Sequence, residues 1–193
     1  MSETPLLELR GVSKHFGAVI ALHEVDFKVD PGRVTALVGD NGAGKSTLIK
    51  CVAGIYHIDG GRILFDGEPV SIAGPRDAAE LGIEIVYQDL ALADNLDVVQ
   101  NMFLGREELD AGRLLDETKM EARARETLAS LSVTTIRSVR QTVAGLSGGQ
   151  RQSVAVAKAV MWNSRLVILD EPTAALGVAQ TRQVLDLVRR LAD

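Results

Sequence analysis

The stretch that most constrains this chain is a glycine-rich turn between two regular elements. Residues 39–47 match the phosphate-binding pattern G-x-x-x-x-G-K-S. Glycines let the backbone curl so that successive N–H groups point at phosphate oxygens, and a helix that begins there adds the positive end of its dipole. The turn therefore predicts binding of a nucleoside triphosphate. The expected contacts are Gly39, Asp40, Asn41, Gly42, Ala43, Gly44, Lys45, Ser46 and Thr47, with Lys45 at the β- and γ-phosphates and the Ser46 hydroxyl on Mg²⁺.

The flanks of this turn have the character that a phosphate site requires. Residues 34–38 are short, apolar and β-rich, which predicts a buried strand, and residues 45–53 read as a helix. A glycine-rich turn can arise by chance, but a random match to this pattern has odds of roughly one in a hundred or less in such a chain. A phosphate site is therefore the stronger interpretation.

Composition narrows the class of protein. A chain of 193 residues with 46% hydrophobic residues suits one domain with a proper core. The net charge of −5 argues against a general nucleic-acid binder, so no nucleic-acid partner is expected. The one cysteine, Cys51, excludes an internal disulfide framework and reads as a small buried side chain on the helix after the turn. Residues 1–5 do not resemble a signal peptide, and no apolar run reaches the roughly 18 residues of a membrane span, so any membrane role is expected through a partner.

The front of the chain predicts a small, largely antiparallel β layer beside the nucleotide-binding strand. Its strands are expected at residues 6–12, 25–29 and 62–65, with a hairpin turn at Asp66-Gly67. A short helix over 75–81 and a strand over 83–87 follow. Phe16, an aromatic residue before a glycine, either stacks on a purine base or belongs to the core at a strand end.

The rest of the chain predicts a helical insert followed by a return to an α/β core. The β signal disappears between residues 91 and 136, and residues 120–131 form a charged helix capped by Asp116 or Thr118. Residues 166–169 read as a strand buried on both faces. Residues 178–191 predict an amphipathic helix, with Val178, Thr181, Leu185 and Val188 on one face and i, i+4 pairs among Arg182, Asp186 and Arg190 on another.

Two acids follow the apolar strand at 166–169. An acid at the carboxyl end of a strand beside a phosphate loop is placed to hold Mg²⁺, which fits Asp170. Glu171 is then expected where an attacking water sits, as the carboxylate that orients the water and accepts its proton. The pair is a weak signal alone and a strong one with the phosphate loop upstream.

A second glycine-rich stretch, Leu146-Ser147-Gly148-Gly149-Gln150, precedes another helix. Ser147 can cap that helix, and Gly148 and Gly149 can expose their amides to an anion. The simpler interpretation is an ordinary helix start. Because the chain already commits one loop to phosphate, we expect this one to close on the γ-phosphate held by another copy, which makes dimerisation ATP-dependent.

In this order, these motifs resemble the nucleotide-binding subunit of an ABC transporter. The resemblance covers essentially the whole chain and implies a RecA-like P-loop core of α/β class, an antiparallel β subdomain and a helical subdomain that holds the signature loop. Phe16 matches the aromatic residue that stacks on adenine, and Gln88 matches the glutamine that senses Mg²⁺ and the γ-phosphate. The resemblance implies an ATPase with ATP and Mg²⁺ as cofactors, a second ATP-binding subunit and a transmembrane permease as partners, and a place on the cytoplasmic face of the bacterial inner membrane. Apolar residues near Gln88 (Leu92, Leu96 and Phe103) are either interface or core, and we expect core for most of them.

Residues 101–107 and 174–178 further resemble bacterial monosaccharide importers of the ribose, xylose and fructose types, which implies an indirect periplasmic sugar-binding partner.

Two features of the chain depart from the family pattern. Gly177 replaces an Asp found in many family members, and the chain stops at Asp193, before the strand whose histidine holds the γ-phosphate in the family; His15, His23 and His57 lie too early to replace it. The expected division is therefore one C-terminally incomplete ATPase domain, with 1–90 as β subdomain and phosphate-loop core, 91–150 as helical subdomain and 151–193 as return to the core.

An ABC-type ATPase head of a DNA-repair protein or translation factor is the alternative. A repair protein needs a long coiled coil or zinc cysteines, for which the span from Gln88 to Leu146 is too short and one cysteine too few. Translation factors carry two heads, whereas one is visible here. A kinase or GTPase of the phosphate-loop type leaves the Ser-Gly-Gly-Gln loop without a role.

Overall fold

The computed structural model describes residues 4–162, 164–174 and 176–192. Met1–Glu3, Ala175 and Asp193, which enter the sequence predictions, lie outside this part. The described chain forms two compact units: the first runs to Ile85 and includes Ala192, and the second is Val86–Leu191. Each unit is described by itself.

The first unit is built on a four-stranded antiparallel sheet of order β2-β1-β3-β4. Leu7, Leu9 and Val12 of β1 are buried in the core, with a register irregularity between Leu9 and Val12. The predicted hairpin at Asp66-Gly67 is confirmed: both residues have positive φ, 54° and 81°, as the tight turn between two twisted strands requires. The predicted β layer is therefore correct, although β1 and β2 are longer than expected. The strands are β1 (Leu7–Phe16), β2 (Val19–Val29), β3 (Gly60–Phe65) and β4 (Glu68–Val70).

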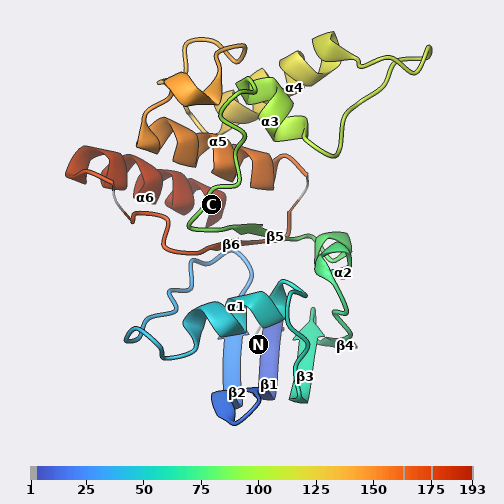
Figure 1. Ribbon diagram of the computed structural model, residues 1–193, viewed down its shortest axis with the longest axis vertical. Coiled ribbons are helices and arrows are strands. Elements are labelled where there is room, and N and C mark those ends of the chain that lie inside the picture. Colours follow the sequence, from blue (N-terminus) through green and yellow to red (C-terminus); the bar gives the residue numbers. More distant parts are fainter. Residues whose placement is uncertain (1–3, 163, 175, 193) are drawn as a thin grey trace. The chain divides into compact units, whose positions relative to one another are not determined.

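One helix packs on this sheet: α1 contacts β2, and Figure 1 shows it in front of β2 and β1. α1 (Lys45–Val52) begins at the predicted residue and buries Leu48, Cys51 and Val52. Cys51 is the buried side chain that the sequence predicts, and burial raises the pKa of its thiol. The first unit continues with α2 (Pro75–Glu80), and β5 (Ile83–Val86) leads from it into the second unit; both elements are close to their predicted bounds.

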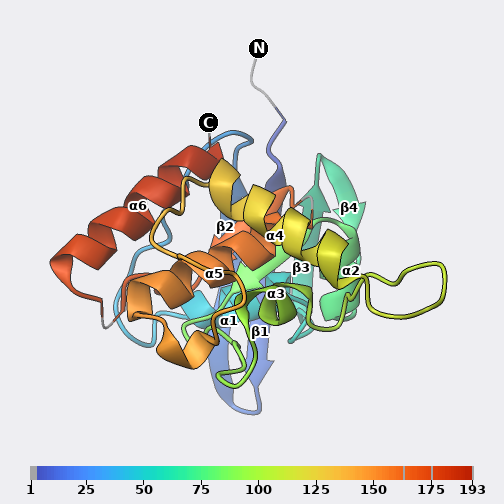
Figure 2. The ribbon, with the colours of Figure 1, turned by 90° about the horizontal axis from the view of Figure 1, so that it is seen from above.

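The second unit has a helical core, and Figure 2 shows α4 crossing over α3 and α5. Phe103 is fully buried in this core and Leu92 packs against it, so the expectation that these apolar residues are core is confirmed. Asp116 caps α4 by accepting the Lys119 N–H at 3.0 Å, which settles the choice between Asp116 and Thr118. The helices are α3 (Val98–Phe103), α4 (Glu117–Ser130), the 3₁₀ turn η1 (Val143–Gly145) and α5 (Gly148–Val160).

The last two elements correct two expectations. The strand β6 (Leu166–Leu169) has the predicted bounds and forms a two-stranded sheet with β5, but all its residues are half-buried rather than fully buried. The helix α6 (Val178–Ala192) buries Val184 and Leu187, whereas Val178 and Leu185 are exposed. The predicted apolar face of this helix is therefore wrong, because α6 packs through the stripe that contains Val184 and Leu187.

The expected strand over residues 34–38 does not form within the described residues. This segment belongs to no strand, and Val34 and Val38 are 57% and 84% exposed. A strand exists only where its N–H and C=O groups pair with a neighbour, and an apolar composition does not supply that neighbour.

Among the described helices, none combines the length and the apolar character needed to cross a membrane.

Candidate nucleotide site

The phosphate loop ends in a left-handed glycine from which α1 begins. Gly44 is the N-cap of α1 with φ 85°, and Gly42 has φ 83°. A Cβ at Gly44 would lie 2.6 Å from the carbonyl oxygen of Ala21, so backbone packing as well as conformation requires glycine there. Lys45, Ser46 and Thr47 therefore form the first helical turn, where backbone N–H groups have no partner within the helix.

The side chain of Lys45 lies back over its own loop. Its Nζ donates to the carbonyl oxygens of Gly39 at 2.7 Å and Asp40 at 2.8 Å, and the Ala43 N–H also donates to Asp40 O, at 3.2 Å. Asp40, Asn41 and Ser46 are exposed. The loop thus presents one ammonium group and the amides of a helix start on the surface of the first unit, a combination suited to an anion.

Phe16 stands at the end of β1 in the same unit. Its ring is 43% exposed and meets the Tyr56 ring edge-on, with centroids 5.0 Å apart. Asp59 fixes the strand end, because it accepts the His15 N–H at 2.6 Å and pairs with the Lys14 Nζ at 2.9 Å. The hydrogen bond from Lys14 is the main reason that the pKa of Asp59 lies below its usual range. Phe16 is therefore an exposed ring held by neighbours, and of its two alternatives the core position is wrong.

In the second unit, Gln88 and Asp170 follow strands that lie side by side. The Asp170 N–H donates to the Val86 carbonyl at 2.9 Å, which aligns the start of the acidic pair with the end of β5. Gln88 is exposed. Burial raises the pKa of Tyr87, and the negative charge of Asp170 raises it further. The structure therefore brings the Gln88 segment and Asp170 to the same edge of the β5–β6 sheet.

Glu171 has a backbone conformation that is rare for its type. Its φ is 50°, in the left-handed region, and its side chain is exposed. A non-glycine residue in such a conformation costs about 1–3 kcal/mol and persists where the surroundings fix it, often at functional sites. The residue whose carboxylate is predicted to activate water therefore also has a strained backbone.

The signature loop is ordered by a capping box. The Gln150 N–H donates to Ser147 Oγ at 3.4 Å, and the Ser147 N–H donates to Gln150 Oε1 at 2.9 Å, so the predicted Ser147 cap of α5 is confirmed. Gly148 is exposed, but Gly149 is buried: a Cβ there would lie 3.2 Å from Gln180 Cγ on α6. The expectation that both glycines expose their amides is therefore wrong for Gly149, because α6 covers it.

A buried asparagine organises the segment before α3, and sequence reasoning missed this role. Asn101 is 0% exposed; its Oδ1 accepts the Ala93 N–H at 2.7 Å and its Nδ2 donates to the carbonyls of Ala93, Leu96 and Asp97. Asp97 and Gln100 form a second capping box at the start of α3. This helix start was not predicted from the sequence, although the spacing of Asp97 and Gln100 before an apolar run is a signal that indicates one.

The predicted site residues fall into two groups, one in each unit. Phe16 and the loop Gly39–Thr47 belong to the first unit; Gln88, Ser147–Gln150, Asp170 and Glu171 belong to the second. No group of three or more His, Cys, Asp and Glu side chains gathers as a metal site among the residues that the structure describes. The expected Mg²⁺ ligands are Ser46 in the first unit and Gln88 and Asp170 in the second, and each of them carries a side-chain oxygen, the type of ligand that Mg²⁺ prefers.

Comparison with known proteins identifies relatives along nearly the whole chain. The chain is 47% identical to the fructose import ATP-binding protein FrcA of Rhizobium meliloti, over 97% of this chain and 75% of that protein. It is 48% identical to the xylose/arabinose import ATP-binding protein XylG of Sulfolobus acidocaldarius, over 96% of this chain and 73% of that protein. It is 43% identical to the ribose import ATP-binding protein RbsA 2 of Escherichia coli O157:H7, where it spans 38% of the relative's length. These relatives confirm the resemblance to monosaccharide importers.

Solved structures confirm the predicted fold. A nucleotide-free ATP-binding cassette from an ABC transporter matches 97% of this chain and 77% of its own, with a TM-score of 0.85 and 27% identity. The cbiO1 protein of Clostridium perfringens, part of the ABC transporter complex cbiONQ, matches 98% of this chain and 74% of its own, with a TM-score of 0.81 and 28% identity. The mixed α/β architecture with an antiparallel sheet and a helical subdomain is therefore that of an ABC ATPase cassette.

The family model for ABC transporters matches residues 22–174, a range that contains the phosphate loop, Gln88, the signature loop and both acids of the Asp170-Glu171 pair. The predicted ATP-binding, ATP-hydrolysing character follows from this match. The chain belongs to the ABC transporter family, as one of its ATPases.

Proposed function

We propose that this chain is the ATP-binding and hydrolysing subunit that powers an ABC importer of a monosaccharide. One observation carries the proposal: the glycine-rich turn enters α1 through the left-handed Gly44 and places Lys45 over the loop, inside a chain whose family match spans 22–174. The names of the fructose, xylose/arabinose and ribose import relatives support the sugar class.

In this proposal, nucleotide binding is the work of the first unit. The amides of the Gly39–Thr47 loop donate to phosphate oxygens, and Lys45 exchanges its two carbonyl acceptors for the β- and γ-phosphates. The exposed ring of Phe16 stacks on adenine. The positive end of the α1 dipole and the ammonium charge both favour the anionic ligand.

Hydrolysis is assigned to the second unit. The carboxylate of Glu171 orients the attacking water and accepts its proton, a contribution of about 10²–10⁴ in rate for a positioned base. Gln88, two residues after the Val86 carbonyl that accepts the Asp170 N–H, positions the same water and the γ-phosphate. Ser46, Gln88 and Asp170 would hold Mg²⁺, which would neutralise part of the phosphate charge when bound.

The partners in this proposal are a second copy of the chain, a permease and, indirectly, a periplasmic sugar-binding protein. The exposed Ser147 and Gly148 close on the γ-phosphate held by the other copy, so that ATP clamps two subunits together and hydrolysis releases them. The subunit then works on the cytoplasmic face of the bacterial inner membrane, bound to the permease. No nucleic-acid partner is included, in keeping with the net charge of −5.

Nucleotide binding is tested by Lys45→Ala in a titration with a fluorescent ATP analogue. Loss of the ammonium group is expected to abolish binding. Lys50→Ala is the control: it removes a lysine from the same helix, whose Nζ lies over the Tyr56 ring, 5.7 Å from its centroid. If the affinity of Lys45→Ala for the ATP analogue is unchanged, the loop does not bind the phosphates.

The catalytic and dimer roles are tested by Glu171→Gln in the complete protein. The variant is expected to bind ATP, to lose turnover, and to accumulate as an ATP-bound dimer that size-exclusion chromatography with light scattering detects. Turnover at the wild-type rate would remove Glu171 from the base role. A strictly monomeric variant in ATP and magnesium, alone and with its permease, would overturn the shared site.

A further inference from the structure

Two distant segments of the second unit lie together just before the signature loop. The segment 94–99, which leads into α3, runs antiparallel to the segment 139–144, with Asp97 and Thr142 as bridge partners. The Val143 N–H donates to the Leu96 carbonyl at 3.0 Å, and the Ala144 N–H donates to the Asp94 carbonyl at 3.0 Å. The second of these segments continues into Ser147, so its order determines where the signature loop begins.

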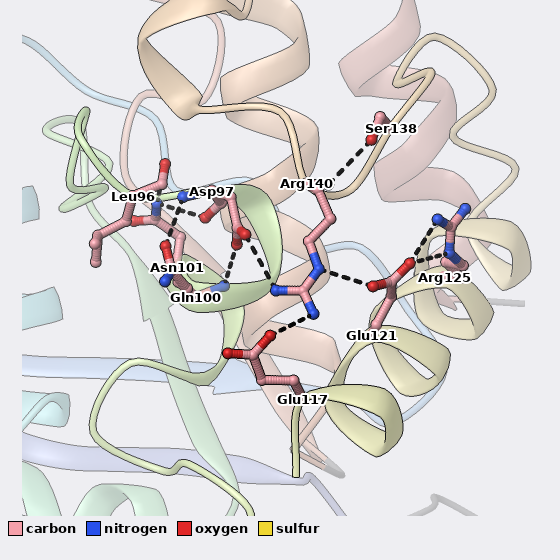
Figure 3. Close-up of polar contacts among 9 residues, drawn as sticks. All are labelled: Leu96, Asp97, Gln100, Asn101, Glu117, Glu121, Arg125, Ser138 and Arg140. Carbon is pink, nitrogen blue, oxygen red and sulfur yellow. Dashed lines mark hydrogen bonds and ion pairs between the residues drawn. The ribbon is translucent and has the colours of Figure 1, made fainter. Parts of the chain in front are cut away.

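Arg140 joins these segments to α4 (Figure 3). Its guanidinium group pairs with Asp97 at 3.4 Å, Glu117 at 3.0 Å and Glu121 at 2.7 Å. Asp97 belongs to the start of α3, and both glutamates belong to the first two turns of α4. A planar fork of five donors suits this three-way contact, which a point charge such as lysine cannot reproduce.

A second arginine holds the other side of the signature loop. Arg151, on the first turns of α5, pairs through Nη1 with Asp94 at 2.9 Å and donates through Nη2 to the Ala144 carbonyl at 3.4 Å. Asp94 and Asp97 therefore each bind one arginine, and the two arginines stand before and after Ser147 in the chain. The four bonds of the buried Asn101 fix the segment that carries both acids.

From this arrangement we propose that Arg140 is a positioning residue for the signature loop: its contacts with Asp97, Glu117 and Glu121 hold the segment 139–144, and with it Ser147, in place for closure on nucleotide. The functional part rests on the proposed function, in which Ser147 meets the γ-phosphate of a second copy. The positioning part rests only on contacts within the second unit.

The chain offers a matched control for this proposal. Arg125 also pairs with Glu121, at 2.7 Å, but it lies on α4 and this contact stays within that helix, one turn apart. Arg140→Ala and Arg125→Ala therefore each remove one arginine from Glu121, and the first of them alone removes the link to the segment 139–144. Both variants are compared in the complete protein, by hydrogen exchange and by ATP-dependent association in the Glu171→Gln background.

Hydrogen exchange reports the positioning directly. In Arg140→Ala, the amides of Val143 and Ala144 are expected to exchange about tenfold faster, because the variant loses ion pairs that each contribute modestly to a network. In Arg125→Ala these amides are expected to change less than about twofold. Equal acceleration in both variants, or no acceleration in Arg140→Ala, overturns the proposal.

Association then tests the functional consequence. With Glu171→Gln as parent, Arg140→Ala is expected to weaken ATP-dependent dimerisation about tenfold. The affinity of each subunit for a fluorescent ATP analogue is expected to stay within about twofold of the parent's, because the phosphate loop belongs to the first unit. Arg140→Lys retains the charge without the fork and is expected to restore part of the loss, which a variant that merely misfolds would not show. Dimerisation of Arg140→Ala at the parent's strength overturns the functional part.

The two proposals fail in different ways. If the Glu171→Gln parent does not dimerise, the shared-site function fails, and the exchange of Val143 and Ala144 still decides whether Arg140 holds this segment. If the parent dimerises and the exchange rates do not distinguish Arg140→Ala from Arg125→Ala, the role assigned to Arg140 is wrong and the proposed function stands.

Discussion

The ring of Tyr56 meets the ring of Phe16 edge-on, with the centroids 5.0 Å apart and the planes at 75°. This contact uses the rim of one ring against the other and leaves Phe16 43% exposed. Tyr56 follows α1 in the chain, and Phe16 ends β1, so the contact ties the aromatic residue to the region that carries the phosphate loop. The orientation of an exposed ring therefore depends on a neighbour that stands far from it in sequence.

Tyr56→Leu is expected to lower the affinity for a fluorescent ATP analogue about 2- to 10-fold, because an edge-to-face aromatic contact contributes about 0.5–1.5 kcal/mol beyond its buried area. Tyr56→Phe retains the ring contact and should bind like the wild type. Wild-type affinity in Tyr56→Leu would mean that Phe16 does not need this support.

Two glycines of the phosphate loop provide a second prediction. Gly44→Ala places a Cβ 2.6 Å from a main-chain oxygen at φ 85°, whereas Gly42→Ala at φ 83° meets nothing within 4 Å. Both variants carry left-handed strain of about 1–2 kcal/mol, and Gly44→Ala adds a clash that raises its loss to about 2–4 kcal/mol. Urea denaturation measures both losses; equal values would show that the contact with Ala21 relaxes freely.

Asn101→Leu is expected to reduce the free energy of unfolding by about 2–4 kcal/mol, since the Ala93 N–H and the carbonyls that Asn101 binds lose their buried partner. The exposed Asn41→Ala serves as control and should stay within about 0.5 kcal/mol. Chemical denaturation checks both variants. A loss in Asn101→Leu no larger than in the control would mean that water replaces the side chain at no cost.

Acid sensitivity is predicted for the sheet of the first unit. Hydrogen bonds from Arg10 and then Lys28 lower the pKa of Glu8 from 4.5 to about 2. Because the folded-state pKa is depressed, the stabilisation by Glu8 is present above pH 4.5 and is lost as the pH falls toward 2. Glu8→Gln should therefore show a weaker loss of stability in this window, measured by denaturation at pH 5 and pH 3. An identical pH dependence in both proteins would contradict the assignment.

Local signals were sufficient for much of this fold. The start of α1 at Lys45, the hairpin at Asp66-Gly67 and the Ser147 cap of α5 depend on residues within one turn of each other, and the sequence predicts each of them. For the cap of α4 the sequence left two candidates, Asp116 and Thr118, and the structure selects Asp116. The family resemblance added the architecture and the ATPase function, which the family match and the solved structures confirm.

The features that the sequence did not predict depend on contacts between residues that are far apart in the chain. α3 is six residues long, and nearly all of them are buried, so it shows no helical periodicity. The wrong face of α6 and the covered Gly149 have one cause, since the contact between α6 and the start of α5 is set by tertiary packing. Arg140 reads as a solvated charge in the sequence, and its three acids come from two other elements. The roles of Gln88, Asp170 and Glu171, and the division into domains, stay predictions.

The buried state of Cys51 has a practical consequence for all of these measurements. It is the chain's single cysteine, it is 2% exposed, and burial raises the pKa of its thiol, so little reactive thiolate forms near neutral pH. A maleimide dye or spin label added to the native protein therefore meets almost no background. Cysteines introduced at surface positions of each unit can carry fluorescent or paramagnetic pairs, and the distance between the units can then be followed through a catalytic cycle without first removing a native thiol.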